Sequence, residues 1–268
     1  MDTKLYRLRE FIRPADGRSL IADTSAGLSL GALPGLEDFS AAAAAALPLL
    51  DGLVASPGQA RRLAGRTRGD AALLVRADWT NALRGADFVL PPETITYLPL
   101  VEPADALDLG ASALAVDFLL GHEEHVEAAC LRLTVQLALE GTRVGLPLIV
   151  DVQPIGPRVV LYNKAVELGV SYAFESGADG VAVPWPGAES FETILKMAAG
   201  SPVWVRPDLS GIEAAVGTES LAPLQEPLAL GATGLWLGAE AFARDDPPAL
   251  FAALSGLVHR PAPQEIPA

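Results

Sequence analysis

The stretch Ser176–Val183 reads SGADGVAV, and it decides the fold because a helix ends at its first glycine and a short apolar strand follows. Leu109–Phe118 (LGASALAVDF) and Leu230–Leu237 (LGATGLWL) repeat this arrangement. A glycine in the left-handed conformation commonly closes a helix. An apolar run of this length is typical of a strand buried on both faces of a parallel sheet. Each stretch therefore predicts a helix-to-strand junction of a parallel α/β fold.

Eight such strands can be placed along the chain, with a helical stretch between each strand and the next. The strands are predicted at Leu20–Asp23, Gly52–Ala55, Ala72–Arg76, Leu114–Phe118, Leu148–Val152, Gly180–Val183, Val203–Arg206 and Gly234–Leu237. The helices are predicted at Leu36–Leu50, Gly58–Gly65, Pro103–Leu109, His122–Gly141, Val160–Ser176, Ser190–Ala199, Ile212–Leu230 and Pro248–Leu257. Eight alternating units favour a closed (β/α)8 TIM barrel over an open doubly wound sheet.

One domain accounts for nearly the whole chain. Its 268 residues are half hydrophobic, which suits a single barrel of about 250 residues. We assign residues 1–260 to the barrel and the proline-rich tail, residues 261–268, to a disordered end. The long connection Arg84–Leu100 is expected to hold an extra strand, Thr94–Leu98, either on the catalytic face or as a surface excursion.

Charge and composition exclude several classes of function. A formal net charge of −14 repels phosphate backbones and anionic membranes, so we expect neither nucleic acid nor a membrane as a partner. Met1–Pro14 carries several charges and no long apolar run, so it matches neither a secretory signal nor a membrane anchor. The single cysteine, Cys130, has apolar neighbours and is assigned to the core. We expect a cytoplasmic protein that acts on a small molecule.

Several segments, taken in order, resemble the archaeal-type class I fructose-bisphosphate aldolases and aminodideoxyheptulosonate synthases, relatives of the deoxyribose-phosphate and tagatose-bisphosphate aldolases. Single glycine-alanine junctions occur in many barrels, so the order and spacing of all the segments together carry the resemblance. The segments are Asp23, Gly27–Gly31 (GLSLG), Gly35–Asp38 (GLED), Gly145–Leu148 (GLPL), Pro154–Pro157 (PIGP), Gly177–Asp179 (GAD), Gly231–Gly234 (GATG), Phe242 and Asp245–Pro247 (DDP). The resemblance implies a TIM barrel, aldolase chemistry and a symmetric homo-oligomer.

The sequence departs from this family at the residues that the family's chemistry requires. The resemblance implies a lysine at the end of strand six, whose amine forms an imine with the substrate carbonyl. Ala182 stands at that position, and a methyl group cannot form an imine. Gln153 corresponds to the family's tyrosine acid/base, and it forms hydrogen bonds but does not titrate. Thr24 replaces the histidine beside the first aspartate.

The implied phosphate site is also changed. The resemblance implies paired glycines after strand seven and a glycine-arginine pair after strand eight, which together would present N–H groups and a guanidinium to the phosphate. Leu209-Ser210 occupies the first position and Gly238-Ala239 the second, so one glycine remains and the arginine is replaced. We therefore expect a non-phosphorylated substrate.

Other polar side chains stand near the carboxyl ends of the predicted strands, where barrel enzymes place catalysis. They are Asp23, Arg76, Asp78, Asp117, Asp151, Gln153, Arg206 and Asp208. Buried charges cost several kcal/mol unless they are paired. The set is therefore either a preorganised site or a layer of ion pairs that satisfy one another.

We assign candidate roles to these residues. The predicted catalytic residues are Asp23, Asp117, Asp151 and Gln153, with Asp117 or Asp151 as general base. The predicted substrate-binding residues are Arg76, Asp78, Trp185, Arg206 and Gly238. Either arginine could hold a carboxylate or polarise a carbonyl. Trp79 and Trp185 either form a wall of the pocket or simply pack.

Two further features have an ordinary and a functional interpretation. His122 and His125 open the fourth outer helix and, with Asp117 or Asp151, could hold a divalent metal. The acidic residues between them are also typical of a first helical turn, and we predict neither a metal nor a cofactor. Lys164 is interpreted as a solvated lysine on an outer helix rather than a displaced imine-forming residue.

Two hypotheses for the function remain open. The first is an aldolase-superfamily lyase, or a related enolising enzyme, that acts on a small non-phosphorylated carbonyl compound without an imine. The second is a catalytically silent relative that binds a metabolite or a partner protein. A shared fold does not choose between the two, because one fold hosts many functions.

Overall fold

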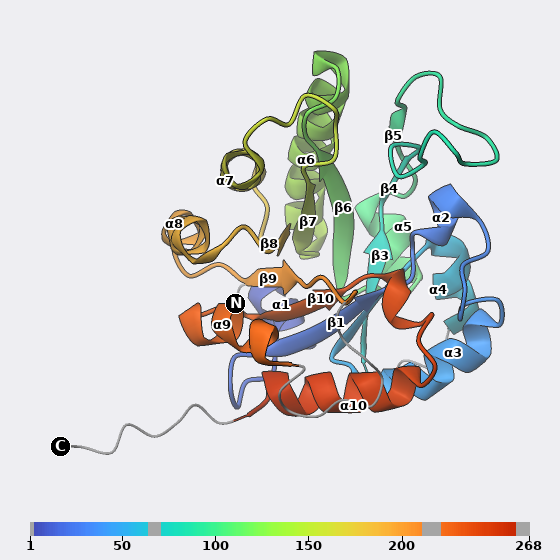
Figure 1. Ribbon diagram of the computed structural model, residues 1–268, viewed down its shortest axis with the longest axis vertical. Coiled ribbons are helices and arrows are strands. Elements are labelled where there is room, and N and C mark those ends of the chain that lie inside the picture. The colour runs from blue at the N-terminus through green and yellow to red at the C-terminus, as the bar shows by residue number, and fades with distance from the viewer. Residues whose placement is uncertain (1–2, 64–70, 211–220, 261–268) are drawn as a thin grey trace.

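Eight parallel strands close into a barrel, in the order β1-β10-β9-β8-β7-β6-β3-β2, in a computed structural model that describes residues 3–63, 71–210 and 221–260 (Figure 1). The strands are β1 (Ser19–Asp23), β2 (Gly52–Ala55), β3 (Ala72–Arg76), β6 (Ala113–Leu119), β7 (Leu148–Gln153), β8 (Gly180–Pro184), β9 (Val203–Arg206) and β10 (Gly234–Leu237). The predicted TIM barrel and its eight strands are confirmed, with bounds that differ by no more than one residue at either end.

Helices surround the barrel and connect its strands. They are α1 (Thr3–Leu8), α2 (Gly27–Leu30), α3 (Phe39–Ala46), α4 (Pro57–Leu63), α5 (Pro103–Asp108), α6 (Glu124–Val144), α7 (Tyr162–Glu175), α8 (Ala188–Ala198), α9 (Ala222–Leu230) and α10 (Pro247–Val258), with the 3-10 turns η1 (Leu47–Leu49) and η2 (Ala239–Ala241). Within the described ranges, none of these helices combines the length and hydrophobicity needed to cross a bilayer. Residues 212–220 of one predicted helix and the tail 261–268 lie outside the described residues.

The three glycine junctions adopt the backbone conformation that the sequence predicts. Gly110, Gly177 and Gly231 have φ angles of 87°, 94° and 115°, in the left-handed region. The predicted helix Leu36–Leu50 is shorter, because the Asp38 carboxylate accepts a hydrogen bond from the Ala41 N–H at 3.1 Å and starts the helix later. Cys130 is fully buried, as predicted.

The long connection after β3 forms a small hairpin outside the barrel, in which β4 (Asp78–Thr80) pairs antiparallel with β5 (Tyr97–Pro99). The sequence predicted β5 at Thr94–Leu98, so the predicted strand begins three residues before the observed one. The reason is the Asn81 side chain, which donates to the Thr94 carbonyl at 2.8 Å and accepts from the Thr96 N–H at 2.7 Å. The side chain of Asn81 thus satisfies backbone groups that a strand partner would otherwise bind.

The segment from α1 to Arg13 closes the amino-terminal end of the barrel. Its charged side chains contact residues that immediately precede strands: Lys4 Nζ lies 2.8 Å from Asp179 Oδ2, and Arg13 Nε lies 2.6 Å from Asp51 Oδ1. Phe11 enters the barrel, where it is 1% exposed and its ring lies 5.9 Å from that of Trp204. The sequence reasoning did not predict this plug.

We expect Phe11→Ala to lower the free energy of unfolding by about 3–5 kcal/mol, because the substitution leaves a cavity in the barrel interior. Tyr6→Ala is the matched control, since Tyr6 is 63% exposed and its loss should change stability by no more than about 0.5 kcal/mol. Denaturant unfolding followed by circular dichroism measures both variants. Equal stability of the two variants would show that Phe11 does not close the barrel.

Candidate active site

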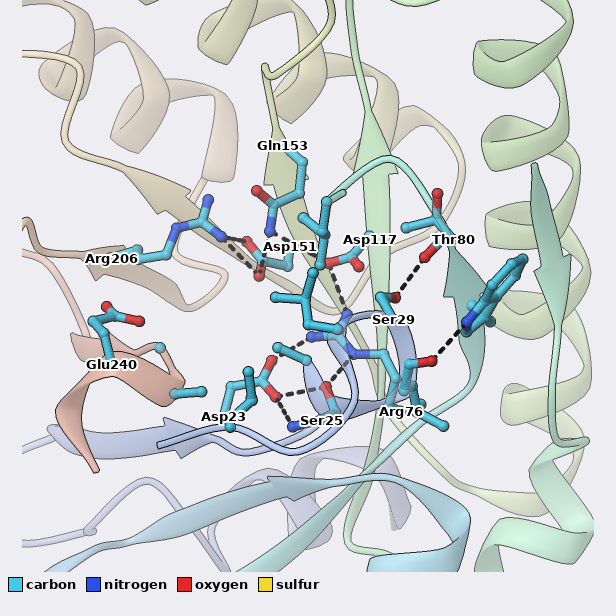
Figure 2. A pocket seen from close by; sticks show the side chains of 18 of the residues that line it. Asp23, Ser25, Ser29, Arg76, Thr80, Asp117, Asp151, Gln153, Arg206 and Glu240 are labelled. Atoms are coloured by element: carbon cyan, nitrogen blue, oxygen red, sulfur yellow. Dashed lines mark hydrogen bonds and ion pairs between the residues drawn. The ribbon is translucent and has the colours of Figure 1, made fainter. Parts of the chain in front are cut away.

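A cavity of about 570 Å³ opens at the carboxyl ends of the strands (Figure 2). Its polar floor comes from residues at or near the ends of β1, β3, β6, β7 and β9, namely Asp23, Arg76, Asp117, Asp151, Gln153 and Arg206. A second cavity of about 580 Å³ lies beside it and shares Arg206 and Glu240 with it. The first cavity therefore occupies the place where barrel enzymes carry their active sites.

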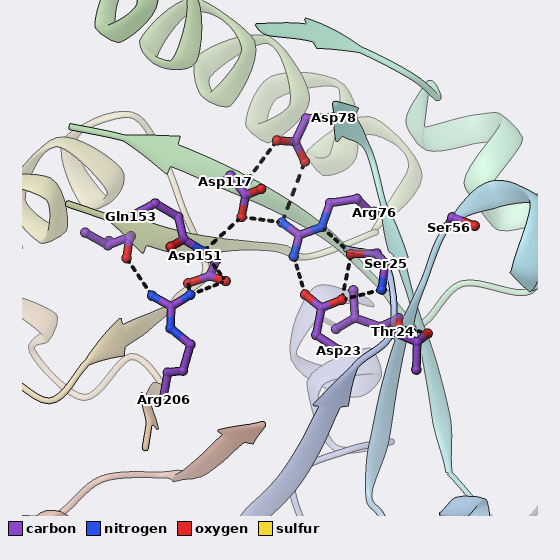
Figure 3. A network of polar contacts seen from close by, with 12 residues as sticks. Asp23, Thr24, Ser25, Ser56, Arg76, Asp78, Asp117, Asp151, Gln153 and Arg206 are labelled. Carbon is purple, nitrogen blue, oxygen red and sulfur yellow. Dashed lines mark hydrogen bonds and ion pairs between the residues drawn. The ribbon is translucent and has the colours of Figure 1, made fainter. Parts of the chain in front are cut away.

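The Arg76 guanidinium is the centre of the polar floor (Figure 3). It is 4% exposed, and it donates from Nε to Ser25 Oγ at 3.0 Å and from Nη1 to Asp117 Oδ1 at 2.9 Å. Nη2 donates to Asp23 Oδ2, and the carboxylate of Asp78 lies 3.7 Å from Nη1. One buried cation is thus shared by three carboxyl groups, so Arg76 is committed to the protein and leaves little donor capacity for a ligand.

Burial and charge act in opposite directions on the groups around Arg76. Burial alone would lower the pKa of Arg76, but Asp117, Asp23 and Asp78 raise it well above the ordinary arginine value. Burial and the neighbouring charge of Asp117 raise the pKa of Asp78 well above that of an ordinary aspartate. The guanidinium of Arg76 acts in the opposite direction and lowers the pKa of Asp78, so burial and an ion-pair partner compete at this carboxyl group.

A second polar group on the floor consists of Asp151, Arg206 and Gln153. Arg206 Nη1 lies 2.9 Å from Asp151 Oδ1 and donates to Oδ2 at 3.0 Å, while Nη2 donates to the Val152 carbonyl at 3.0 Å. Gln153 Nε2 donates to Asp151 Oδ2 at 3.1 Å and lies 3.4 Å from Asp117 Oδ1. Gln153 therefore connects the second group to the Arg76 cluster.

Asp151 has the titration behaviour that acid/base chemistry requires. Burial raises the pKa of Asp151 to about 7, although the Arg206 guanidinium acts in the opposite direction and lowers it. Asp151 is 2% exposed but lines the cavity, so its carboxyl group is desolvated while adjoining the space for a ligand. A carboxyl group of this kind can accept a proton near neutral pH and return it.

Ala182 lies beside Asp151 in the barrel. The strand register pairs Asp117 with Asp151 and Asp151 with Ala182, and the Ala182 methyl group belongs to the buried cluster inside the barrel. All three lysines of the sequence are described, and none lines either cavity. Lys4 pairs with Asp179 at the opposite end of the barrel, Lys164 is exposed and pairs with Glu167 at 2.8 Å, and Lys196 is exposed on α8.

Comparisons with known proteins agree with this architecture, although no protein-family model matches the chain. The chain is 29% identical over 254 residues to 2-amino-3,7-dideoxy-D-threo-hept-6-ulosonate synthase of Halobacterium salinarum. The aligned region covers 93% of this chain and 90% of that protein. It is 28% identical over 254 residues to an uncharacterized aldolase of Saccharolobus solfataricus, covering 92% and 91% of the two chains. Both comparisons show that this chain is similar, over nearly its whole length, to a named synthase and to an uncharacterized aldolase.

Two further comparisons extend this result. The chain is 25% identical over 258 residues to 3-hydroxy-5-phosphonooxypentane-2,4-dione thiolase of Yersinia pestis, covering 95% and 81% of the two chains. Its fold matches that of a Schiff-base-forming fructose-1,6-bisphosphate aldolase with a TM-score of 0.76, at 24% identity and with 96% and 100% of the chains covered. The second likeness shows that this chain shares the barrel fold of that aldolase.

The structure places all but one of the predicted site residues in the first cavity, at the carboxyl ends of the strands. The residues that line it are Asp23, Arg76, Asp78, Asp117, Asp151, Gln153, Arg206 and Gly238. Trp185 instead lines the second cavity and packs on Phe191, with 5.3 Å between the ring centroids. The placement supports a common site, while the role of each residue stays a prediction.

The histidine pair does not assemble a metal centre with the floor. His122 is buried and His125 is exposed, so the two side chains differ in their surroundings. Burial lowers the pKa of His122. Across the ranges that the structure describes, no group of three or more histidine, cysteine or acidic side chains is arranged to hold a metal ion.

Ser25, Trp236 and Glu240 are among the cavity residues that were not predicted from the sequence. Ser25 Oγ donates to Asp23 Oδ1 at 2.6 Å, so Ser25 orients the carboxylate that binds Arg76. Trp236 extends from β10 into the barrel interior, and Glu240 follows β10 at the rim. A serine two residues after a strand-ending aspartate is a recognisable local signal. An acidic residue in a loop carries no comparable signal.

The raised pKa of Asp151 predicts a pH-dependent stability. Between its ordinary value of 3.8 and about 7, the folded protein holds a proton that the unfolded chain releases, so the wild type loses stability as pH rises through this window. Asp151→Asn stays neutral and avoids this loss. From about pH 4.5 to about pH 7.5 we expect the stability of the variant relative to wild type to improve by on the order of 2 kcal/mol.

Thermal and denaturant unfolding at a series of pH values measures this difference. Asp105→Asn, at an exposed position on α5, is the matched control and should show no such trend. A stability difference between Asp151→Asn and wild type that stays constant across the window would contradict the raised pKa.

Proposed function

We propose that this protein makes or breaks a carbon–carbon bond beside the carbonyl group of a small, non-phosphorylated compound, without an imine intermediate. The observation that carries the proposal is Asp151, whose carboxyl group has a pKa of about 7 and contacts both Arg206 and Gln153 at the cavity floor. The similarity to aldolases supports the reaction class. The methyl group of Ala182 on β8 and the distant lysines support the absence of an imine.

The proposed cleavage acts on a β-hydroxy carbonyl compound. Asp151 accepts the proton of the hydroxyl group, the bond between the α and β carbons breaks, and its electron pair forms the enolate of the shorter carbonyl product. The guanidinium of Arg206 and the amide N–H of Gln153 stabilise the enolate oxygen. Asp151 then returns its proton to the α carbon, and the other product leaves as an aldehyde or ketone. Synthesis is the same sequence in reverse.

The Arg76 cluster holds the floor in place in this proposal. Its ion pairs and hydrogen bonds orient Asp117, which accepts from both Arg76 and Gln153. Asp23 and Asp78 neutralise Arg76 and are positioning residues rather than groups that touch the substrate. The preorganised carboxylates and guanidiniums avoid reorganisation during the reaction, which is the main electrostatic contribution of enzyme sites.

The proposal of a homo-oligomer, which the resemblance implies, is supported by α6. Leu131, Val135 and Leu139 form an exposed apolar stripe, 42%, 39% and 62% exposed. Glu127 and Arg143 lie equally far from Val135 along the helix, so two antiparallel α6 helices would place opposite charges together. Light scattering measures the assembly, and Leu139→Glu should dissociate it if this stripe is the interface.

The reaction predicts a defined pH profile. Because Asp151 acts as a base, kcat/KM for cleavage should rise with pH and reach half of its maximum near pH 7. Asp151→Asn should lower kcat by about 10²–10⁴-fold, whereas Asp105→Asn should leave it unchanged. Release of aldehyde from a panel of non-phosphorylated β-hydroxy ketones, measured by a coupled dehydrogenase, follows the reaction. An active Asp151→Asn variant with the wild-type pH profile would refute this role.

Borohydride reduction tests the absence of an imine. With carbonyl products present, the protein should keep its unmodified mass, whereas a Schiff-base-forming fructose-1,6-bisphosphate aldolase should gain a covalent adduct under the same conditions. A reduced adduct on any of the three lysines would overturn the proposed mechanism. Binding of these carbonyl compounds without cleavage of any β-hydroxy ketone would favour the catalytically silent alternative.

A further inference from the structure

One side of the first cavity, the one above the polar floor, is a wall of apolar side chains. The wall comes from α2 with the loop after it, and from the β4–β5 hairpin, both of which lie above the floor (Figure 2). Its members are each partly exposed: Leu28, Leu30, Leu33, Trp79 and Leu83. Leu28, Leu30 and Leu83 are not part of the buried core clusters, so core packing does not explain their apolar character.

Polar contacts hold α2 against the hairpin. Trp79 Nε1 donates to the Leu28 carbonyl at 2.9 Å, and Arg84 Nε donates to the Ser29 carbonyl at 2.8 Å. The Arg84 guanidinium also lies 5.7 Å from the Trp79 ring centroid, within range of a cation–π contact. The wall is therefore formed before a ligand arrives, and a ligand that contacts it does not have to order it.

The opposite rim of the cavity is acidic. The Glu240 carboxylate folds against Gly238, where an added Cβ would lie 2.1 Å from Glu240 Oε2. Glu240 lines both cavities, and the floor beneath it contains four aspartates and two arginines. A phosphorylated or otherwise strongly anionic arm would meet this carboxylate, so neither side of the mouth suits one.

The cavity is larger than its polar floor requires. A volume of about 570 Å³ holds on the order of 20 water-sized groups, and most of the charged side chains lie at its base. Ligand sites commonly combine a few convergent polar groups with a larger apolar surface. The floor fits a carbonyl head group, and the remaining space lies along the wall.

We propose that the ligand of this cavity carries an uncharged apolar arm, aliphatic or aromatic, on the carbon chain beyond its carbonyl group, and that the arm lies against Leu28, Leu30, Leu33 and Leu83. This inference rests on the proposed function only for the carbonyl head group. Apolar burial stabilises by about 25 cal/mol per Å². A ketone with an arm that buries roughly 100 Å² would therefore bind about 70-fold more tightly than the same ketone without it.

Non-reacting ketones test the wall separately from catalysis. Benzylacetone, butanone and dihydroxyacetone phosphate are titrated into the full-length protein, and binding is followed by calorimetry. We expect benzylacetone to bind at least ten-fold more tightly than the other two. Leu83→Asn and Leu30→Asn should each lower the affinity for benzylacetone several-fold. Val160→Asn is the matched control, because the Val160 side chain is 89% exposed and lies outside the cavity. This variant should bind benzylacetone with wild-type affinity.

The outcomes separate this inference from the proposed function. Equal affinity for benzylacetone and butanone, tighter binding of dihydroxyacetone phosphate, or wild-type binding of benzylacetone by both leucine variants would overturn the apolar arm. Cleavage of short β-hydroxy ketones could still occur in that case. Conversely, the wild-type protein could prefer benzylacetone and cleave none of the β-hydroxy ketones, with the same binding preference in Asp151→Asn. That result would support the apolar arm and refute the proposed lyase.

Discussion

The buried guanidinium of Arg76 is the constraint on which the rest of the site depends. One cation enclosed at the carboxyl end of a barrel must be neutralised there, and Asp23, Asp117 and Asp78 do so from three strands or strand ends. With Asp151 and Arg206, the floor contains more carboxyl groups than guanidiniums. Burial, together with the charge of the neighbouring Asp117, therefore raises the pKa values of Asp78 and Asp151.

In the proposed function, this barrel differs from the Schiff-base-forming aldolase whose fold it shares, because it forms no covalent bond to the substrate. In the proposed mechanism, Arg206 on β9 supplies the positive charge beside Asp151, while the neighbouring position on β8 holds the methyl group of Ala182. A guanidinium stabilises an enolate by charge and hydrogen bonds but forms no bond to carbon. Catalysis then depends on how firmly the floor is held, and the Arg76 cluster with Gln153 provides that rigidity.

The barrel and its loops have distinct tasks. The strands hold the polar floor, because strand ends in a closed parallel sheet cannot move independently. The α2 segment and the β4–β5 hairpin add the apolar wall, and hairpin side chains donate hydrogen bonds to the Leu28 and Ser29 carbonyls of α2. Such surface segments can change a wall without disturbing the floor, so the proposed function places substrate choice and reaction chemistry on different parts of the chain.

The sequence by itself determined the eight strands, the glycine junctions, the single domain and the polar positions at strand ends, because these follow from local periodicity and from backbone conformations that glycine adopts most easily. Only the tertiary structure decided that Trp185 lies outside the main cavity, that Asn81 delays β5, that Phe11 plugs the barrel, and that Glu240 folds over Gly238. Each of these depends on contacts between segments distant in the sequence or on the direction of a side chain. The raised pKa of Asp151 likewise results from burial among side chains of other strands, which no local pattern records.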